Sequence, residues 1–215
     1  MVVDDQALVR AGFAAILSTE DDLDVVAEVE DGAEALATAQ SVQPDVVLMD
    51  IRMPGVDGIT ATQQLISRGP AGVKVLMLTT FDLDEYLYEA MKAGASGFLL
   101  KDAPREQLLH AVRSVAAGDA ALSPTLVQRL VDDYVRRPAP GAPASGAVTS
   151  LTAREREVLL HLARGLSNAE TARELFLGEA TVRTHIGHIF DKLGVRDRVQ
   201  AVIVAYESGL VTPGG

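Results

Sequence analysis

The sequence contains no cysteine and no tryptophan, and only 4% of its 215 residues are aromatic. The absence of cysteine excludes a disulfide scaffold, a thiol nucleophile and a cysteine-ligated zinc or iron–sulfur site. No apolar run reaches the ~18 residues that cross a bilayer, and the N-terminus turns acidic after two valines, unlike a signal peptide. We therefore expect a cytoplasmic protein with no membrane partner.

Charge is unevenly distributed along the chain. The formal net charge is −11, and residues 1–120 carry 20 acidic and 8 basic side chains, whereas residues 148–215 carry eight of each. A net negative protein repels phosphates, so any binding to DNA requires a small local surface. The contrast between an acidic half and a neutral half predicts two modules with different tasks.

A segment rich in proline, glycine and alanine, residues 138–146, separates these modules, because it can sustain neither a helix nor a central strand. A helix-like run, residues 124–137, precedes it. We predict a first domain at residues 1–120, a linker at 121–147 and a second domain at 148–215.

The first module alternates short apolar runs with amphipathic ones. Apolar runs that predict buried parallel strands, besides Val2–Val3, are Leu23–Val29, Asp45–Met49, Val73–Leu78 and Gly97–Leu100. Helical spacing is found in Ala7–Ser18, Ala33–Gln40, Ile59–Ser67, Leu83–Ala93 and Arg105–Ala117. This alternation predicts an α/β fold, a five-stranded doubly wound parallel sheet with helices on both faces.

The second module has four short helical segments: Ala153–Ala163, Asn168–Leu175, Glu179–Leu193 and Asp197–Ser208. The second and third are separated by only three residues. A small all-helical domain with such a turn is a helix-turn-helix candidate.

Polar residues follow several predicted strands of the first module. Asp4 and Asp5 follow the first strand, and Asp50, Thr79 and Lys101 follow later ones. Ligands of parallel sheets bind at the carboxyl ends of the strands, so these side chains are expected to converge. Three carboxylates close together need a cation, and their hard oxygens suit Mg²⁺. A hydroxyl and an ammonium nearby suit an incoming phosphoryl group.

These residues, with the runs Asp50–Gly58, Leu78–Thr80 and Gly94–Lys101, resemble the receiver domain of two-component response regulators. The runs Leu151–Val158, Gly165–Asn168 and Ala180–His185 resemble the LuxR-type helix-turn-helix. The combination resembles the NarL/FixJ subgroup, in which the receiver has the flavodoxin-like strand order.

The resemblance implies a role for each residue of the site. Asp50 is similar to the phosphoacceptor, which takes a phosphoryl group from a partner histidine kinase. The implied Mg²⁺ ligands are Asp5, Asp50, the Arg52 carbonyl and, through water, Asp4. Lys101 and Thr79 would contact the phosphoryl oxygens. Phe98 is similar to the aromatic residue that changes its packing when Thr79 moves.

The first strand is short for such a domain. Only Met1, Val2 and Val3 precede the acidic pair, whereas strands usually have about five or six residues. We expect either a translation start upstream of Met1 or a receiver of marginal stability.

The third helix of the second module has two distinct faces. An apolar stripe of Val182, Ile186, Ile189, Phe190 and Leu193 predicts burial. On the polar face, Arg183 can bond to guanine and Thr184 can meet a base edge. Gly187 indicates either close approach of the backbone to double-stranded DNA or weaker base readout. Thr181, His188 and Lys192 are expected to contact phosphates.

The last helix offers the apolar positions Val199, Val202 and Tyr206, some of which must close the domain core while others could form a two-fold contact. Dimers on paired half-sites would double the phosphate contacts that a neutral domain lacks. We therefore predict a homodimer when Asp50 is phosphorylated.

The sequence thus predicts a transcriptional response regulator and no enzyme, beyond Mg²⁺-dependent self-phosphorylation from small phosphodonors and self-dephosphorylation. One alternative is a hydrolase of the haloacid-dehalogenase type, which requires an aspartate two places after the nucleophile. This chain has Arg52 there, which argues against a hydrolase. An atypical regulator, whose receiver is not phosphorylated and acts as an interaction or ligand-binding module, is the other alternative.

Overall fold

A computed structural model describes residues 1–79, 86–118 and 148–211 of the chain. The chain forms two compact units, Met1–Ala121 and Leu122–Gly215, which are described separately. The predicted linker and the helix-like run before it lie outside the described residues, as does the start of the helix expected at Leu83–Ala93.

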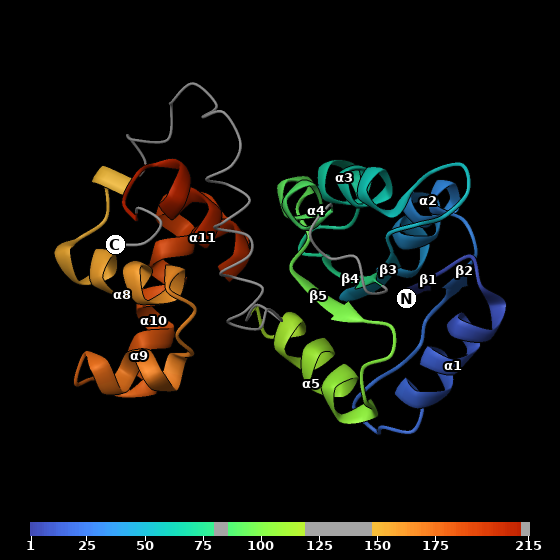
Figure 1. Ribbon diagram of the computed structural model, residues 1–215, viewed down its shortest axis with the longest axis horizontal. Helices are drawn as coiled ribbons and strands as arrows, with labels where there is room; N and C mark the ends of the chain where they lie inside the picture. Colours follow the sequence, from blue (N-terminus) through green and yellow to red (C-terminus); the bar gives the residue numbers. More distant parts are fainter. Residues whose placement is uncertain (80–85, 119–147, 212–215) are drawn as a thin grey trace. The chain divides into compact units, whose positions relative to one another are not determined.

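The first unit is an α/β domain in which strands and helices alternate (Figure 1). Its strands are β1 (Val2–Val3), β2 (Glu28–Val29), β3 (Val46–Asp50), β4 (Lys74–Thr79) and β5 (Gly97–Leu100). Its helices are α1 (Ala7–Leu17), α2 (Gly32–Val42), α3 (Gly58–Arg68), α4 (Leu87–Ala93) and α5 (Arg105–Ala116).

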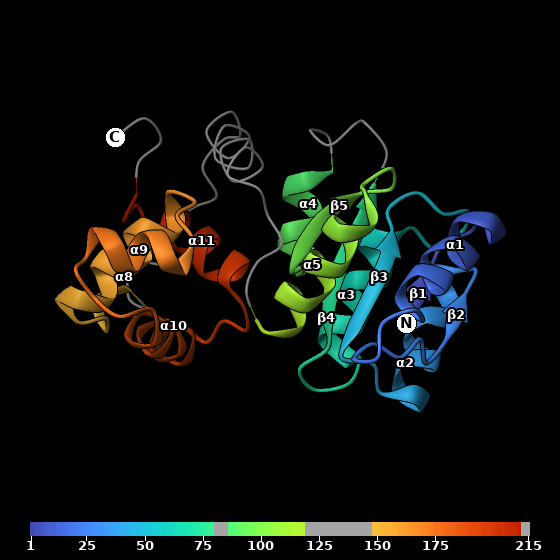
Figure 2. The ribbon, with the colours of Figure 1, turned by 90° about the horizontal axis from the view of Figure 1, so that it is seen from below.

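All five strands are parallel, in the order β2-β1-β3-β4-β5. Figures 1 and 2 show α1 and α5 on one face of the sheet and α2, α3 and α4 on the other. The five-stranded doubly wound fold that the sequence predicts is therefore confirmed. Because the strands are parallel, their carboxyl ends meet at one edge, where the candidate site lies.

Side chains that alternate along the strands build the core beneath α1 and α5. Leu48 and Leu76 of the central strands pack there against Phe13 of α1 and Leu108 of α5. The intervening residues of these strands, such as Met49 and Met77, are also fully buried. A strand buried on both faces needs apolar side chains at successive positions, which explains the unbroken apolar runs.

β2 is shorter than the sequence predicts, because only Glu28 and Val29 of the expected run Leu23–Val29 form a strand. β2 is an edge strand, and its neighbour β1 offers only Val2 and Val3 for pairing. A segment forms a strand only where its main chain bonds to a neighbouring strand. The short strand β1 therefore also limits the length of the edge strand β2.

The second unit consists of α8 (Ala153–Ala163), α9 (Asn168–Glu174), α10 (Glu179–Leu193) and α11 (Arg198–Glu207). Thr152 and Ser167 begin α8 and α9 as N-caps, each with a glutamate three positions later that completes a capping box. Gly194 ends α10 in the left-handed conformation.

The core of this unit contains the stripe of α10 that the sequence predicts. Val182, Ile186 and Ile189 are buried, and they pack in one cluster with residues of α8 and α11. None of the helices in the described part of the chain combines the length and the apolar character that crossing a bilayer requires.

Candidate functional site

Four strand ends bring polar residues to one edge of the parallel sheet. Asp4 and Asp5 follow β1, Asp50 and Thr79 are the last residues of β3 and β4, and Lys101 follows β5. The main-chain N–H of Lys101 donates to the carbonyl of Thr79 at 2.8 Å, which joins the ends of β4 and β5. The convergence that the sequence predicts is therefore present.

The Lys101 ammonium lies between two buried carboxylates. Its Nζ is 2.8 Å from Oδ2 of Asp4 and 2.9 Å from Oδ2 of Asp50. These three side chains are only 11%, 0% and 5% exposed, respectively. Buried charges need partners, and here one cation satisfies two anions while leaving one negative charge in excess.

Asp5 adds an exposed carboxylate to this pair. Oxygen atoms of Asp4, Asp5 and Asp50 all lie within 4.8 Å of one another. One ammonium cannot neutralise three carboxylates at this spacing, and such a set of hard oxygen donors fits a small divalent cation such as Mg²⁺. We refer to Asp4, Asp5 and Asp50 as the acidic cluster.

The environment of the site shifts two ionisation equilibria. Burial raises the pKa of Asp50 above its ordinary value, while the Lys101 ammonium and the Arg52 N–H, which bond to its carboxylate, act in the opposite direction. Burial lowers the pKa of Lys101, but its hydrogen bonds to Asp4 and Asp50 outweigh this, so that its pKa is raised. Lys101 is therefore cationic across the physiological range.

The loop after Asp50 passes very close to the strand that carries it. An added Cβ on Gly58 would lie 1.9 Å from the carbonyl oxygen of Asp50, and one on Gly32 would lie 2.3 Å from that of Val56. Only glycine leaves room for such an approach. Asp57, the N-cap of α3, accepts from Thr60 N–H and so orients the helix that follows.

Thr79 and Phe98 are both buried, at 6% and 4% exposure. Thr79 ends β4, and Phe98 pairs with Met77 in the β4–β5 register. Arg52 is exposed, and its guanidinium lies over the ring of Tyr86, 5.2 Å from the centroid. The switch role of Thr79 and Phe98 and the ligand role of the Arg52 carbonyl stay predictions.

Sequence reasoning missed Arg10. Its Nη1 donates to the main-chain carbonyl of Asp4 at 2.5 Å. The signal was available, because Arg10 is the one charged residue in the otherwise apolar and small run of α1.

The polar face of α10 is open to solvent. Thr181, Arg183, Thr184, Gly187 and His188 are exposed, whereas the intervening apolar residues are buried. Arg183 Nη2 lies 3.4 Å from Oε1 of Glu179, a weak exposed pair that DNA phosphates or bases can displace. The helix-turn-helix formed by α9 and α10 therefore presents the surface that the sequence predicts, while the individual DNA contacts stay predictions.

Lys192 is differently placed from the other predicted contacts. Its ammonium pairs with the buried carboxylate of Glu155 in α8 at 2.7 Å. This bond gives Lys192 a role within the domain, and its predicted contact with phosphate remains untested.

The dimer contact predicted for Val199, Val202 and Tyr206 stays a prediction, but in the described structure Val199 and Val202 belong to the core of the second unit. Both side chains are buried inside the second unit, at 0% and 3% exposure. Tyr206 is half-buried, and its hydroxyl donates to the carbonyl of Ala163 at 3.1 Å. The helical periodicity alone did not separate a core stripe from a surface stripe, because α11 is largely apolar.

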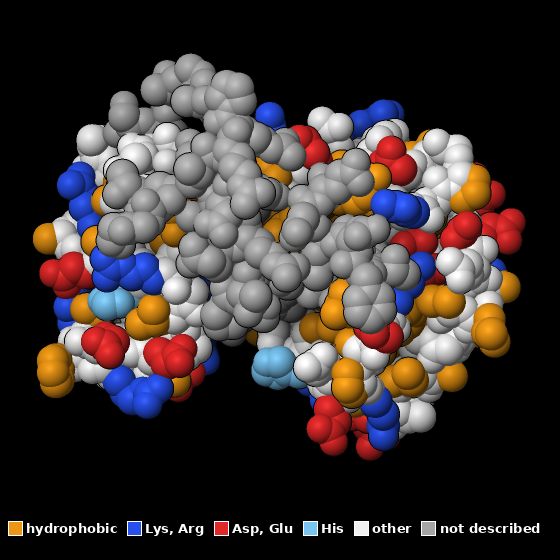
Figure 3. Space-filling model, in the orientation of Figure 1, with side chains coloured by type: hydrophobic (Ala, Val, Ile, Leu, Met, Phe, Trp, Pro, Cys, Tyr) orange, Lys and Arg blue, Asp and Glu red, His pale blue; other side chains and the backbone are white. Residues whose placement is uncertain are grey.

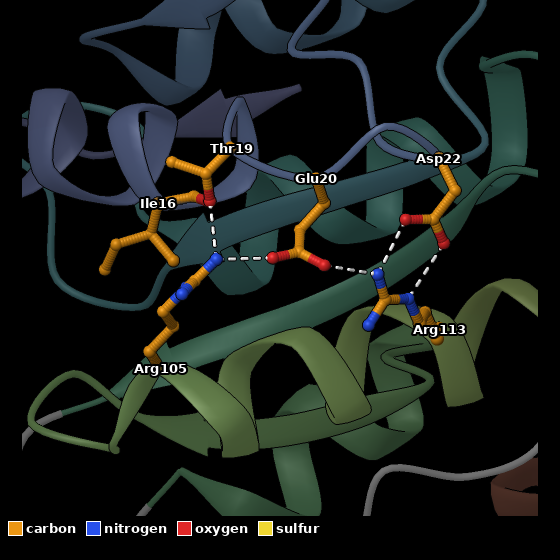
Figure 4. Close-up of polar contacts among 6 residues, drawn as sticks. All are labelled: Ile16, Thr19, Glu20, Asp22, Arg105 and Arg113. Carbon is orange, nitrogen blue, oxygen red and sulfur yellow. Dashed lines mark hydrogen bonds and ion pairs between the residues drawn. The ribbon is translucent and has the colours of Figure 1, made fainter.

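Acidic side chains are visible at several places on the surface of the first unit (Figure 3). An ion-pair network on this unit joins α5 to the segment after α1: Arg113 binds Glu20 and Asp22, and Arg105 binds Glu20 and Thr19 (Figure 4).

Two family models match the chain. Residues 1–113 match the response regulator receiver domain, and residues 149–205 match the LuxR family of bacterial regulatory proteins. A transcriptional regulatory protein of Bacillus subtilis, YxjL, is 39% identical over 98% of this chain and 95% of its own length. The oxygen regulatory protein NreC of Staphylococcus carnosus is 38% identical over 98% of both chains.

Among solved structures, the response regulator ChrA of a heme-sensing two-component system is 42% identical, with a TM-score of 0.51. It covers 98% of this chain, and the match includes 97% of ChrA. The doubly wound sheet and the helix-turn-helix lie within the segments that match the two family models. This chain therefore belongs to the two-component response regulators of the NarL/FixJ subgroup, transcriptional regulators that join a receiver domain to a LuxR-type DNA-binding domain.

Proposed function

We propose that phosphorylation of Asp50 by a partner histidine kinase switches this regulator to a state that binds DNA as a homodimer. One observation carries the proposal: the Lys101 ammonium bridges the carboxylates of Asp50 and Asp4, with Asp5 beside them. The parallel strand ends hold all four groups before any phosphoryl group arrives, so little reorganisation is required.

In the proposed step, an Oδ of Asp50 attacks the phosphorus of a phosphohistidine on the kinase. The new P–O bond makes an acyl phosphate, while the P–N bond breaks and its electron pair stays on the imidazole nitrogen. Lys101 would exchange its bond to the Asp50 carboxylate for one to a phosphoryl oxygen, and Thr79 would donate its hydroxyl to another.

Asp5, Asp50 and the Arg52 carbonyl would hold Mg²⁺, with Asp4 acting through water. When bound, the ion supplies positive charge to the phosphoryl oxygens in the transition state. The same groups would accept a phosphoryl group from a small phosphodonor and later allow water to hydrolyse the acyl phosphate, which is the extent of the proposed self-catalysis.

Phosphorylation adds charge at the end of β3, and we propose that Thr79 and Phe98 transmit the change through repacking. The second domain has eight acidic and eight basic residues, so one copy attracts DNA weakly. Two copies on paired half-sites would double the phosphate contacts, which is why dimerisation would control affinity.

For DNA recognition we propose Arg183 and Thr184 as base contacts and Gly187 as a point of close approach. Thr181, His188 and Lys192 would contact phosphates. We keep residues 1–120, 121–147 and 148–215 as the proposed domain limits. A DNA target also implies a cytoplasmic location.

The test treats the full chain with acetyl phosphate and Mg²⁺, then measures mass, oligomeric state and affinity for duplexes that the wild type selects from a random pool. We expect one added phosphoryl group, dimer formation and tighter DNA binding, all lost in Asp50→Asn. Asp57→Asn is the matched control, because asparagine also caps a helix and Asp57 lies in the following loop.

Each alternative gives its own result. If acetyl phosphate adds no phosphoryl group to the wild type and the protein nevertheless binds DNA, the result would favour an interaction module over a phosphorylated receiver. Continuous release of phosphate without stable modification would favour a hydrolase. An Asp50→Asn variant that dimerises in response to acetyl phosphate would overturn the proposal.

A further inference from the structure

Arg10 is an arginine in an unusual position. It is the single charged residue of α1, and its side chain is only 14% exposed. Burying most of a guanidinium is costly unless its donors find acceptors, so the contacts of this side chain indicate what it does.

The guanidinium joins three elements next to the acidic cluster. Nη1 donates to the main-chain carbonyl of Asp4 at 2.5 Å, and Nε lies 3.9 Å from a carboxylate oxygen of Glu28 in β2. Arg10 thereby connects α1 and the edge strand to the peptide that links Asp4 to Asp5.

Further bonds complete the hold on Asp4. Its main-chain N–H donates to the carbonyl of Val29 at 3.1 Å, and its Oδ1 accepts from the N–H of Gln6 at 2.9 Å. The main-chain carbonyl of Asp4 accepts its hydrogen bond from a side chain, the guanidinium of Arg10. Removing Arg10 therefore frees the Asp4–Asp5 peptide on the side that no strand holds.

The short first strand makes this anchor necessary. β1 pairs in register through Val2 and Val3, and Asp4 adds one further main-chain bond, to Val29 of β2, so Asp5 lies just beyond the last residue that the sheet holds. A chain that has just left its sheet is free to rotate about its backbone dihedrals unless another group fixes it. The guanidinium holds it with one N–H, from Nη1 to the Asp4 carbonyl, while a second nitrogen, Nε, faces the Glu28 carboxylate, a geometry that the single ammonium of lysine does not reproduce.

We propose that Arg10 is a positioning residue for the divalent cation site: through the Asp4 carbonyl it sets the direction of the Asp5 carboxylate toward the carboxylates of Asp4 and Asp50. This inference rests on the proposed function, because it assumes that the cluster binds Mg²⁺. Residues that orient metal ligands without contacting the ion typically contribute 10–100-fold to metal affinity.

A competing effect has the opposite sign. Arg10 is a cation near a cation site, so its removal would strengthen Mg²⁺ binding if charge alone mattered. Glu28 offsets that charge, because its carboxylate lies 3.9 Å from Nε of Arg10, and ~0.3 M salt weakens the part of the repulsion that passes through solvent. Positioning should therefore outweigh repulsion at this salt concentration.

The experiment titrates Mg²⁺ into the full-length, unphosphorylated protein at ~0.3 M salt and follows the amide NMR signals of Asp5 and Gln6. We expect the dissociation constant to rise about tenfold in Arg10→Ala. Arg10→Lys keeps the charge and one donor, so we expect about a threefold rise, a partial rescue. Glu28→Gln, which loses the second anchor of the guanidinium, should show a smaller rise than Arg10→Ala.

Arg113→Ala is the matched control, because Arg113 makes ion pairs of its own with Glu20 and Asp22 rather than with the acidic cluster (Figure 4). Urea unfolding of each variant records the loss of stability. Both arginine-to-alanine variants should lose stability, whereas only Arg10→Ala should lose Mg²⁺ affinity.

The outcomes separate this inference from the proposed function. If the wild type binds Mg²⁺ and Arg10→Ala binds it equally or more tightly, Arg10 is no positioning residue, although the cation site stands. If the wild type shows no response to Mg²⁺, the cation site of the proposed function fails, and the role of Arg10 fails with it. Equal weakening in Arg113→Ala would show a general effect of lost stability and would also overturn the inference.

Discussion

The ammonium of Lys192 and the carboxylate of Glu155, 37 positions apart, join the last turn of α10 to the first turn of α8. Nζ lies 2.7 Å from one carboxylate oxygen and 2.9 Å from the other. The same carboxylate accepts the N–H of Thr152 at 2.7 Å, which completes the capping box of α8. One buried side chain therefore caps α8 and holds α10, the helix that we propose reads DNA.

This relationship predicts a specific dependence on pH. The bond to Lys192, helped by the Thr152 N–H, lowers the pKa of Glu155 from 4.5 to about 2. A carboxyl whose pKa is lowered by folding stabilises the protein above its unfolded pKa, and that contribution is lost as pH falls toward the folded pKa. We expect Glu155→Gln to be less stable than the wild type at neutral pH, with the difference shrinking between pH 4.5 and about 2.

Urea unfolding of the full chain, followed by NMR signals of α10, measures that difference at each pH. Glu157→Gln is the control, because Glu157 is 51% exposed and pairs with Arg154 at 2.6 Å on its own helix. A constant difference between the wild type and Glu155→Gln down to pH 2 would contradict the prediction.

Thr171 and Thr62 are both fully buried, and we expect their replacement by valine to change the free energy of unfolding in opposite directions. Thr171 Oγ1 is buried without a hydrogen-bond partner in the described structure, whereas Thr62 Oγ1 donates to the carbonyl of Gly58 at 2.6 Å. Removing an unsatisfied hydroxyl should raise the free energy of unfolding by about 1 kcal/mol, and removing a satisfied one should lower it by a similar amount. Chemical denaturation of Thr171→Val and Thr62→Val checks the signs, and equal signs would refute the assignment.

We likewise expect the replacement of Gly58 and of Gly12 by alanine to change stability in opposite directions. A Cβ at Gly58 would meet the main chain of Asp50 at 1.9 Å, so Gly58→Ala must displace that residue, at a cost of about 1–3 kcal/mol. Its rate of phosphorylation by acetyl phosphate should also fall. Gly12 in α1 has nothing within 4 Å of an added Cβ, so Gly12→Ala should stabilise by about 0.5–1 kcal/mol. Thermal unfolding and the phosphorylation rate are the measurements, and normal phosphorylation of Gly58→Ala would count against the close approach.

Phe176 combines two unfavourable features in the turn between α9 and α10. Its side chain is 95% exposed, and its φ of +53° lies in the left-handed region. Glycine adopts this conformation without the cost of about 1 kcal/mol that an L side chain meets. Phe176→Gly should therefore raise the free energy of unfolding of the second domain by about that amount. Unfolding followed in the full chain tests this, and a loss of stability would indicate a packing role that its exposure does not suggest.

Much of the fold could be predicted from the sequence because its signals are local. Ala153–Ala163 and Glu179–Leu193 have the same limits in the sequence prediction and in the structure. Capping residues and apolar periodicity act within a few positions, so they can be read directly. The convergence of Asp50 and Lys101 could also be predicted, because parallel strands necessarily bring their carboxyl ends to one edge.

Other features depend on which distant segments meet. Apolar spacing in α11 left open which of Val199, Val202 and Tyr206 close the domain core, because both faces of that helix carry apolar residues, whereas the structure shows Val199 and Val202 buried. The length of β2 was overestimated, because β1 limits the pairing available to it.

Local patterns of residues thus specified most of the helices and the parallel α/β fold, and the family resemblance that those residues carry implied the order of the strands. Folding alone revealed that Lys192 binds Glu155, that Arg10 reaches the Asp4 carbonyl and that Thr171 lacks a partner. The physical reason is the distance along the chain over which each signal acts. Helix caps and periodicity act over a few residues, whereas the surroundings of these three side chains are set by the packing of separate elements.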